Sequence, residues 1–445
     1  MIEQSQGFWC LWSGKSRIPD ICLVNLFFYI ATVLLLMALP PAQAREIYIQ
    51  PSVNIRTIYD DNRRMVTSSN SGGAGKSVYG VISDALARIG VRSNQYDVAL
   101  NSKFSLRRYD SDVNLDSENI YLDLTSNYKL SERTQFGLTG NYTRDTTLTS
   151  ELLVTGLVKD NRIRHKWSLG PQWSYMLSKR QSLQASYTHL DISYAKSAGR
   201  SRLVDYTTDT ASLTYNMQWT ALLRNYISLS WLSFQVPDSN RQLSNVVSKH
   251  TSRDTTQYSI SIGADYQFLP TWNASFMVGE RFSSAKSDSI ILVSGRPVFG
   301  THSTSSSSNQ GLIFSFSINK QFEVGKAGLS YSRSTSASGY GRLQVFERLQ
   351  ANFDHKITDH LRFALRGGIN KTSSSSNSNT RNSTSNRTYY HVTPTLSWIF
   401  NRQLKLSAGY RYRKQKYANN NEAAISNAVF LNFNYQWDKL KTQRY

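Results

Sequence analysis

Cysteine is almost absent from this 445-residue chain, and its two cysteines, Cys10 and Cys22, both lie near the N-terminus. The rest of the chain therefore has no disulfide and no thiolate for metal or redox chemistry. Proline is also scarce, with 9 residues, and residues 95–437 lack the i, i+3, i+4, i+7 apolar spacing of an amphipathic helix. These absences exclude a disulfide scaffold and a helical framework.

The N-terminal segment has the pattern of a secretory signal. An apolar run extends from Ile21 to Leu39, and Ala42-Gln43-Ala44 fits the small-x-small cleavage rule. We predict a signal peptide at residues 1–44, cut after Ala44, and a mature chain at 45–445. The run has about 19 residues, so an uncleaved transmembrane anchor is the alternative. No cysteine follows the run, which argues against a lipoprotein.

Acidic residues are few relative to basic ones, and the formal charge is +21. The predicted signal carries two basic residues, Lys15 and Arg17, and two acidic ones, Glu3 and Asp20, so the excess stays with the mature chain. A positive excess of this size indicates an anionic partner or surface. Composition does not distinguish nucleic acid, lipopolysaccharide and acidic glycan, but export through the inner membrane argues against nucleic acid.

Aromatic and aliphatic residues alternate with polar ones on both sides of short polar turns. Around 131–133, Ile120 to Leu130 and Phe136 to Tyr142 both show this period of two, which predicts a β-hairpin. Tyr175-Met176-Leu177-Ser178-Lys179-Arg180 repeats the device, and looser copies are centred near residues 221, 269, 322, 358 and 401. Hairpins repeated at a spacing of roughly 45 residues indicate an array.

Counted along the chain, the alternating segments predict eighteen strands. Residues 78–92 are the least regular, and 83–88 could form one helical turn. Short turns alternate with long polar loops at 144–162, 236–255, 282–308 and 370–387. The Ser/Asn-rich tracts Ser303 to Asn309 and Thr372 to Asn386 are expected to be solvated, mobile loop tips.

This asymmetry is typical of an outer-membrane barrel, with short periplasmic turns and long extracellular loops. A bilayer tolerates no unpaired backbone groups, so the sheet must close. We therefore predict an all-β protein, a transmembrane antiparallel β-barrel of about eighteen strands. The alternative is a soluble all-β sandwich or propeller.

Side chains at alternate positions of a strand point to opposite faces of the sheet, and we call each such set one parity of the strand. If the apolar parity faces lipid, the opposite parity lines the interior. Basic residues on that parity are the candidate lumen-facing contacts for an anion or polymer: Arg56, Lys103, Arg107, Arg164, Lys166, Arg281, Arg348, Arg362, Arg366, Lys405, Arg411 and Arg413. The same faces carry Asp97, Asp123, Asp265 and Asp354. The pattern predicts an electropositive duct. Alternatively, Arg–Asp ladders satisfy a polar interior that binds nothing.

Catalytic patterns are lacking. The seven histidines show no ligand spacing on one strand face, and no Gly-rich phosphate loop follows a strand and opens a helix. We expect no enzyme activity, no metal and no cofactor.

Several short motifs resemble a known family. They are Ile49-Gln50-Pro51-Ser52 before a strand that ends in Tyr59-Asp60-Asp61-Asn62, the units Tyr128-x-Leu130-Ser131-x-Arg133 and Tyr175-x-Leu177-Ser178-x-Arg180, and Asp205-Tyr206 at the start of a strand. Together they resemble the outer-membrane β-barrels encoded with exopolysaccharide biosynthesis and exosortase (PEP-CTERM) systems. The resemblance implies a role in producing or exporting an extracellular polysaccharide. Residues Asp438 to Tyr445, which follow Trp437, depart from the usual barrel ending.

The first functional hypothesis is a passive outer-membrane conduit whose basic lumen carries an exopolysaccharide, expected to be acidic. Its expected partners are the outer membrane with its lipopolysaccharide, the extracellular polysaccharide and a periplasmic export partner. One alternative is a general diffusion porin that prefers anions. Another is a structural or adhesive barrel without transport.

Overall fold

The computed structural model describes residues 45–67, 77–110, 115–154, 161–195, 203–242, 247–374, 386–418 and 422–444. The predicted signal peptide at 1–44 lies outside these residues. The elements are β1 (Arg45–Asp60), β2 (Val78–Arg92), β3 (Tyr96–Tyr109), β4 (Ser117–Lys129), β5 (Thr134–Thr146), α3 (Thr147–Val154), β6 (Ile163–Ser178), β7 (Gln181–Tyr194), β8 (Tyr206–Gln218), β9 (Leu223–Gln242), β10 (Val247–Leu269), β11 (Trp272–Val293), β12 (Arg296–Pro297), β13 (Ser303–Phe322), β14 (Gly325–Ser338), β15 (Arg342–Lys356), β16 (Leu361–Ser374), β17 (Arg387–Ile399), β18 (Leu404–Tyr417), β19 (Ala423–Gln436) and β20 (Leu440–Arg444).

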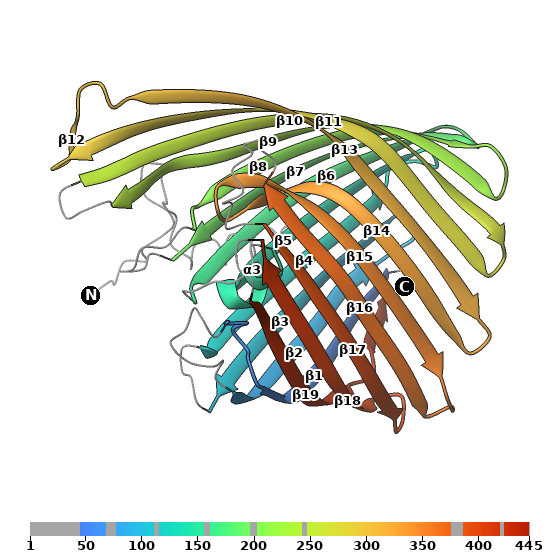
Figure 1. Ribbon diagram of the computed structural model, residues 1–445. Helices are drawn as coiled ribbons and strands as arrows, with labels where there is room; N and C mark the ends of the chain where they lie inside the picture. Colours follow the sequence, from blue (N-terminus) through green and yellow to red (C-terminus); the bar gives the residue numbers. More distant parts are fainter. Residues whose placement is uncertain are drawn as a thin grey trace, which may run out of the picture. The chain divides into compact units, whose positions relative to one another are not determined.

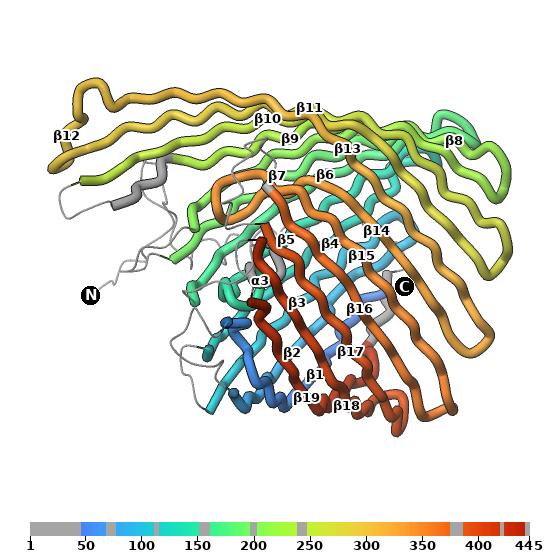
Figure 2. The backbone as a smooth tube through the Cα atoms, viewed as in Figure 1, coloured from blue at the N-terminus to red at the C-terminus, as the bar shows by residue number. Residues whose placement is uncertain are grey.

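The strands form one closed antiparallel sheet, in which each long strand pairs with its neighbours in the sequence (Figures 1 and 2). Closure comes from β1, which pairs with β2 on one side and with β19 on the other. Eighteen strands are long, whereas β12 and β20 contain two and five residues. The predicted all-β barrel of about eighteen strands is confirmed.

The recurring Ser in the strand–turn unit caps the short turns. Ser131 Oγ accepts hydrogen bonds from the backbone N–H groups of Arg133 and Thr134, at 3.2 and 3.0 Å. Ser178 Oγ accepts one from Arg180 at 3.2 Å, and Thr220 and Asn401 act in the same way at later turns. A side-chain acceptor that satisfies turn N–H groups explains why Ser, Thr and Asn recur at these positions.

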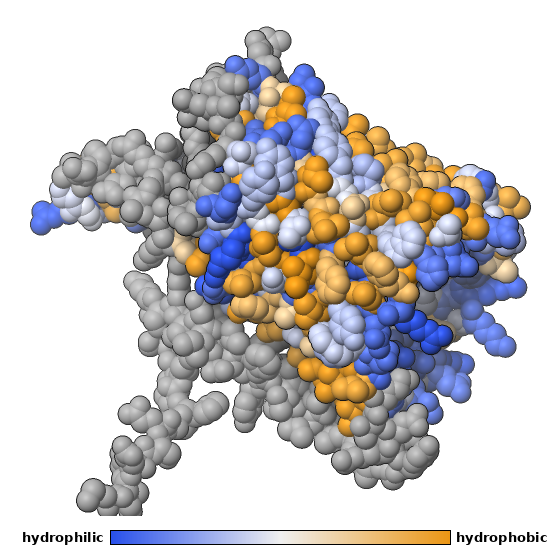
Figure 3. Space-filling model, turned by 90° about the horizontal axis from the view of Figure 1, so that it is seen from below, coloured by the Kyte–Doolittle hydropathy of each residue, from blue (hydrophilic) through white to orange (hydrophobic). Residues whose placement is uncertain are grey.

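The outer face of the barrel is apolar. Side chains of the apolar parity remain exposed on the isolated chain, for example Ile260, Leu329, Leu396 and Leu431 at 42 to 50%. Figure 3 shows apolar residues over much of the visible barrel surface, with hydrophilic ones towards its margin. Exposed apolar surface of this extent is suited to contact with lipid. Among the described residues, no helix has the length and apolar character needed to cross a membrane.

Residues 78–92 form a regular strand, β2, so the helical turn considered for 83–88 is wrong. On β2 the lumen-facing residues Val78 and Ile82 are as apolar as the lipid-facing residues Tyr79 and Val81. Val78 packs inside the barrel against Ile58 of β1, Tyr109 of β3 and Leu148 of α3. Apolar contacts on both faces remove the alternation from which a strand would be recognised.

The long-loop end differs from the sequence prediction. Strands β9, β10 and β11 extend through much of the predicted loops 236–255 and 282–308, because polar residues continue the pairing beyond the apolar part of each strand. Ser303 to Asn309 are not a mobile tip; they belong to β13 and pair with β11 from Ser289 to Ser283. Residues 147–154 of the predicted polar loop form α3, whose Leu148 is buried on the inner wall. Of the tract Thr372 to Asn386, residues 375–385 lie outside the described residues.

The C-terminal residues continue the closing strand. After β19 ends at Gln436, β20 pairs with Arg45 to Ile49 of β1. The partner of Ser52 is Gln436 and the partner of Ile49 is Leu440, so the register shifts by one residue between them. Such a shift is a β-bulge, and it explains how the residues after Trp437 fit the barrel.

Candidate functional site: the basic inner wall of the barrel

The candidate site is the inner wall, where all twelve predicted basic residues have lumen-facing parity. Cross-strand register carries this parity from strand to strand: Arg56 pairs with Asn432, and Arg366 with Thr393. The apolar residues of β1 and β19, such as Ile55 and Phe433, have the opposite parity and are exposed. The structure therefore places the twelve side chains on one surface, but it divides them into groups with different surroundings.

One group surrounds a cavity of about 860 Å³ near the short-turn end, which is the periplasmic end in outer-membrane barrels. We call this cavity the basic vestibule. Its wall is made by β1 and by β13 to β19, together with the turn at 323–324. Its cationic side chains are Arg56, Lys326, Lys356, Arg362, Arg366, Lys405 and Arg411, against the carboxylates of Glu323 and Asp354. The vestibule therefore carries more positive than negative side chains.

Most vestibule cations have no carboxylate close by. Within the described residues, Arg362, Arg366 and Lys405 form no ion pair, and Arg56 donates from Nε to Asn432 Oδ1 at 3.3 Å. Two vestibule cations do have a carboxylate nearby: Lys356 Nζ lies 2.5 Å from Asp359 in the adjoining turn, and Arg411 lies 3.4 Å from Asp60. The hydrogen bond from Lys356 lowers the pKa of Asp359, which keeps that carboxylate charged. The unpaired cations are available to a mobile anion.

Three candidates on β3 and β6, Lys103, Arg107 and Arg164, have local carboxylate or hydroxyl partners instead. Arg164 Nε donates to Asp145 Oδ1 at 3.0 Å, and Lys103 Nζ lies 3.5 Å from Asp84. Arg107 donates to Thr149 Oγ1 of α3 at 2.7 Å. These contacts match the ladder alternative of the sequence analysis. Ion pairing thus occupies this part of the wall, and binding of an anion by the vestibule cations stays a prediction.

Three further predicted residues lie outside the vestibule, and two of them, Arg281 and Arg348, have polar but uncharged partners. Arg281 is 4% exposed and donates to Asn309 Oδ1 at 3.0 Å, while Arg348 donates to Asn370 Oδ1 at 3.1 Å. Lys166 faces the lumen between Asn141 and Asp145 on the neighbouring strand β5, opposite Thr143. None of these three lines the vestibule.

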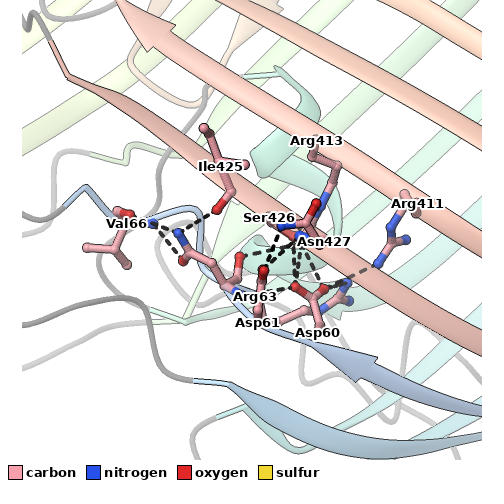
Figure 4. Close-up of polar contacts among 10 residues, drawn as sticks. Asp60, Asp61, Arg63, Val66, Arg411, Arg413, Ile425, Ser426 and Asn427 are labelled. Atoms are coloured by element: carbon pink, nitrogen blue, oxygen red, sulfur yellow. Dashed lines mark hydrogen bonds and ion pairs between the residues drawn. The ribbon is translucent and has the colours of Figure 1, made fainter.

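Arg413 and Arg411 form a charged network at the seam that closes the barrel (Figure 4). The Asp60 carboxylate is fully buried and accepts hydrogen bonds from Arg413 at 2.8 Å and from Ser426 at 2.8 Å. Arg411 lies 3.4 Å from the same carboxylate. We call Asp60, Arg411, Arg413 and Ser426 the closing network. It joins the end of β1 to β18 and β19.

The two residues after Asp60 extend this junction. Asp61 accepts hydrogen bonds from the backbone and the side-chain nitrogen of Asn427, both at 2.7 Å. Asn62 donates to the carbonyls of Val66 and Ile425, at 2.9 Å each, and so holds the start of the β1–β2 loop against β19. The Tyr59-Asp60-Asp61-Asn62 motif therefore has a structural role.

Above the vestibule, towards the long-loop end, apolar clusters occupy the inside of the barrel. Leu148 of α3 packs with Tyr109 and Leu115 near β1 to β3. A second group, the cross-lumen cluster, joins β7 to β9 with β15; it contains Ile192, Tyr194, Tyr206, Phe234, Val236 and Leu343. The strands β9 to β14 separate β8 from β15 in the sheet, so these contacts cross the interior. These clusters reduce the open space inside the barrel at this level.

Sequence reasoning missed Lys326 and Lys356 as vestibule residues. Both lie at the ends of strands next to short turns, where a slip of one residue reverses the assigned face. The cross-strand partners Lys326 and Asp354 show the correct parity only once the register is known. Among the described residues, no cluster of three metal-ligating side chains occurs.

Comparison with known proteins gives a partial family match and distant structural neighbours. Residues 84–201 match the family described as "Putative MetA-pathway of phenol degradation", which is less than half of the chain. No curated protein matches. Solved structures include Pseudomonas aeruginosa OpdQ (12% identity, 88% of this chain and 97% of that chain, TM-score 0.42) and Acinetobacter baumannii OccAB2 (13%, 88% and 98%, 0.43).

The Escherichia coli K12 ferric-catecholate import receptor Fiu is another such neighbour, with 8% identity over 89% of this chain and 82% of that chain and a TM-score of 0.47. Likeness at these scores carries no argument about function. The closed pairing and the apolar outer face carry the assignment. This chain is an outer-membrane β-barrel. None of the three comparisons shows a link to exopolysaccharide or exosortase systems.

Proposed function

We propose that the barrel is a diffusion channel that favours small anionic solutes. The observation that supports this function is the basic vestibule, in which seven cations and two carboxylates surround one cavity. Low-dielectric walls strengthen the attraction between these cations and an anion, and so raise the local anion concentration. Arginine also binds carboxylate or phosphate through two parallel hydrogen bonds.

Export of an acidic exopolysaccharide, the first hypothesis from the sequence, has the same basic lining but less support. A hydrated polymer needs a continuous wide path, whereas α3 and the cross-lumen cluster occupy the interior beyond the vestibule. Small solutes need only a narrow passage. The porin alternative therefore explains the described interior with fewer rearrangements. A barrel without transport is the third possibility, and the same experiment tests it.

The test is ion selectivity in planar bilayers. We expect the refolded barrel to give an anion-selective reversal potential in a KCl gradient. Arg362→Ala combined with Arg366→Ala should move that potential towards zero, because two unpaired vestibule cations are lost. The matched control is Arg333→Ala with Lys371→Ala, which removes two cations from the outer parity, both next to Glu347. The control should retain the wild-type selectivity.

Three other results would change the proposal. A cation-selective or unselective wild-type channel would refute anion preference. Block of the current by an acidic oligosaccharide, relieved in the double vestibule variant, would favour the polysaccharide conduit. Absence of current from a correctly folded barrel would favour a structural or adhesive role.

A further inference from the structure

The wall of the barrel divides between β13 and β14 at the long-loop end. The two strands pair from Phe322–Gly325 to Phe314–Arg333 and then stop. Both strands nevertheless continue: β13 remains paired with β11 as far as Ser303, and β14 remains paired with β15 as far as Ser338. Each therefore has one edge that no strand in the described part of the chain covers.

The tip of the β14–β15 hairpin lies inside the barrel. On these strands the lipid-facing parity includes Leu329 and Leu349, and the same parity leads to Ala337 and Leu343 at the tip. Yet Leu343 is 4% exposed and packs in the cross-lumen cluster with Phe234 and other lumen-facing residues of β7 to β9. A side chain of outer parity reaches that cluster only because the tip has left the wall.

Specific contacts hold the tip in this position. The backbone N–H of Val204 donates to the Gly339 carbonyl at 2.8 Å, and Arg253 donates to the Gly341 carbonyl at 3.3 Å. A Cβ atom at Gly341 would lie 2.9 Å from Val204, so this close approach depends on glycine. Gly341 also has a φ of 70°, which glycine adopts without strain.

The held position leaves polar groups unsatisfied. Thr335 Oγ1 and Gln344 Oε1 are buried without a hydrogen-bond partner. Buried polar atoms in this condition are uncommon and destabilising, so the held tip is not the best arrangement for every group in it. The free edge of β13 from Ser303 to Ile313 is also unusual, because it contains no proline and no charged residue of the kind that protects edge strands.

From these observations we infer that the hairpin tip is a gate with two positions. In the second position β14 resumes its pairing with β13 in the existing register, which places Leu312 opposite Thr335 and Gln310 opposite Ala337. Leu343 and Ala337 would then lie on the outer face, as their parity requires. The wall would be continuous, and the interior beside β7 to β9 would be vacated.

The consequence for conduction rests on the proposed channel function. With the tip held by the cross-lumen cluster, the long-loop half of the interior is occupied; with the tip in the wall, the path from the vestibule widens. The gate therefore changes conductance, while selectivity remains a property of the vestibule cations.

Disulfide trapping tests the second position. Cys10 and Cys22 precede the barrel, so the pair Leu312→Cys and Thr335→Cys introduces the only cysteines in residues 45–445. After oxidation of the folded, membrane-inserted protein, mass spectrometry should detect the 312–335 crosslink in most molecules. The second in-register pair, Gln310→Cys with Ala337→Cys, guards against a folding defect of the first. The out-of-register control, Leu312→Cys with Ser338→Cys, should remain reduced.

Conductance completes the test. Oxidised 312–335 channels should conduct severalfold more than the same channels after reduction. Absence of crosslinks in both in-register pairs, or equal crosslinking of the out-of-register control, would overturn the gate. A crosslink without a change in conductance would overturn its effect on the path. Absence of current in every variant, with the crosslink present, would refute the channel function and leave the two-position hairpin standing.

Discussion

At two seams of this barrel the long strands pair over equal lengths, but only one seam is continuous at the long-loop end. β1 pairs with β19 over nine residues, and β13 pairs with β14 over nine residues. At the first seam, pairing reaches the end of β1, where the buried Asp60 carboxylate binds Arg413 and Ser426. At the second, no ion pair between the described residues of β13 and β14 joins them, and the strands part. The buried closing network therefore distinguishes the closed seam from the divided one.

Loss of Asp60 should have the largest effect on this difference. Asp60→Ala leaves Arg413, which is 3% exposed, without its carboxylate, and removal of one partner from a buried pair costs about 3–5 kcal/mol. We expect a large fall in the free energy of unfolding in urea, and loss of the compact form in unheated SDS gels. Asp60→Ala combined with Arg413→Leu should recover part of the stability. Unchanged unfolding of the single variant would show that the closing network does not hold the seam.

Glycine packing at the closed seam should have an intermediate effect. Gly409 of β18 lies directly beneath the Phe430 ring of β19, and a Cβ atom there would overlap that ring. Overpacking of this kind costs about 1–3 kcal/mol, so Gly409→Ala should lower the denaturant midpoint. Gly367→Ala is the matched control, since its Cβ would meet its nearest neighbour at an ordinary 3.5 Å. Equal midpoints for the two variants would contradict the packing argument.

The β20 extension of the closed seam, which follows the β-bulge, should contribute least to the free energy of unfolding. Lys439 Nζ lies 2.9 Å from Glu46 and 3.7 Å from the centre of the Tyr48 ring, but its side chain is 28% exposed. Partly exposed ion pairs contribute about 0–1 kcal/mol, so Lys439→Ala should shift the midpoint only slightly, and the shift should diminish further in high salt. A loss as large as that of Asp60→Ala would mean that the periplasmic end holds the closure.

The sequence predicted the barrel because its signals are local. Turn caps such as Ser131 and Ser178 act within three residues, and strand alternation assigns each side chain to lipid or lumen. The register places the twelve basic candidates on the lumen-facing side of their strands, and their contact with an anion stays a prediction. The sequence failed at β2 and at Ser303 to Asn309, because an apolar interior removes alternation from one strand and a polar strand that extends past the membrane looks like a loop.

Grouping of the basic residues depended on tertiary structure. Parity puts Arg164 and Arg362 on the same surface, but only the register shows that Asp145 lies beside the first and no carboxylate beside the second. Whether a basic side chain is neutralised depends on its partners on neighbouring strands. These partners are distant in the sequence, so they cannot be identified from it. The sequence therefore predicted an excess of positive charge on the inner wall, but it did not predict where in the barrel that excess lies.

Local sequence signals were sufficient to predict an antiparallel barrel with a polar, basic inner face. Period-two patterning and turn chemistry act between near neighbours, so they survive without knowledge of the fold. Tertiary structure alone decided where the wall closes and where it divides. Residues 334–338 continue strand β14, yet their position is set by Val204, Phe234 and Val236, roughly a hundred residues or more away. The hairpin tip can pair with the edge of β13 or pack in the cross-lumen cluster. The choice depends on residues distant in the sequence, so no local pattern predicts it.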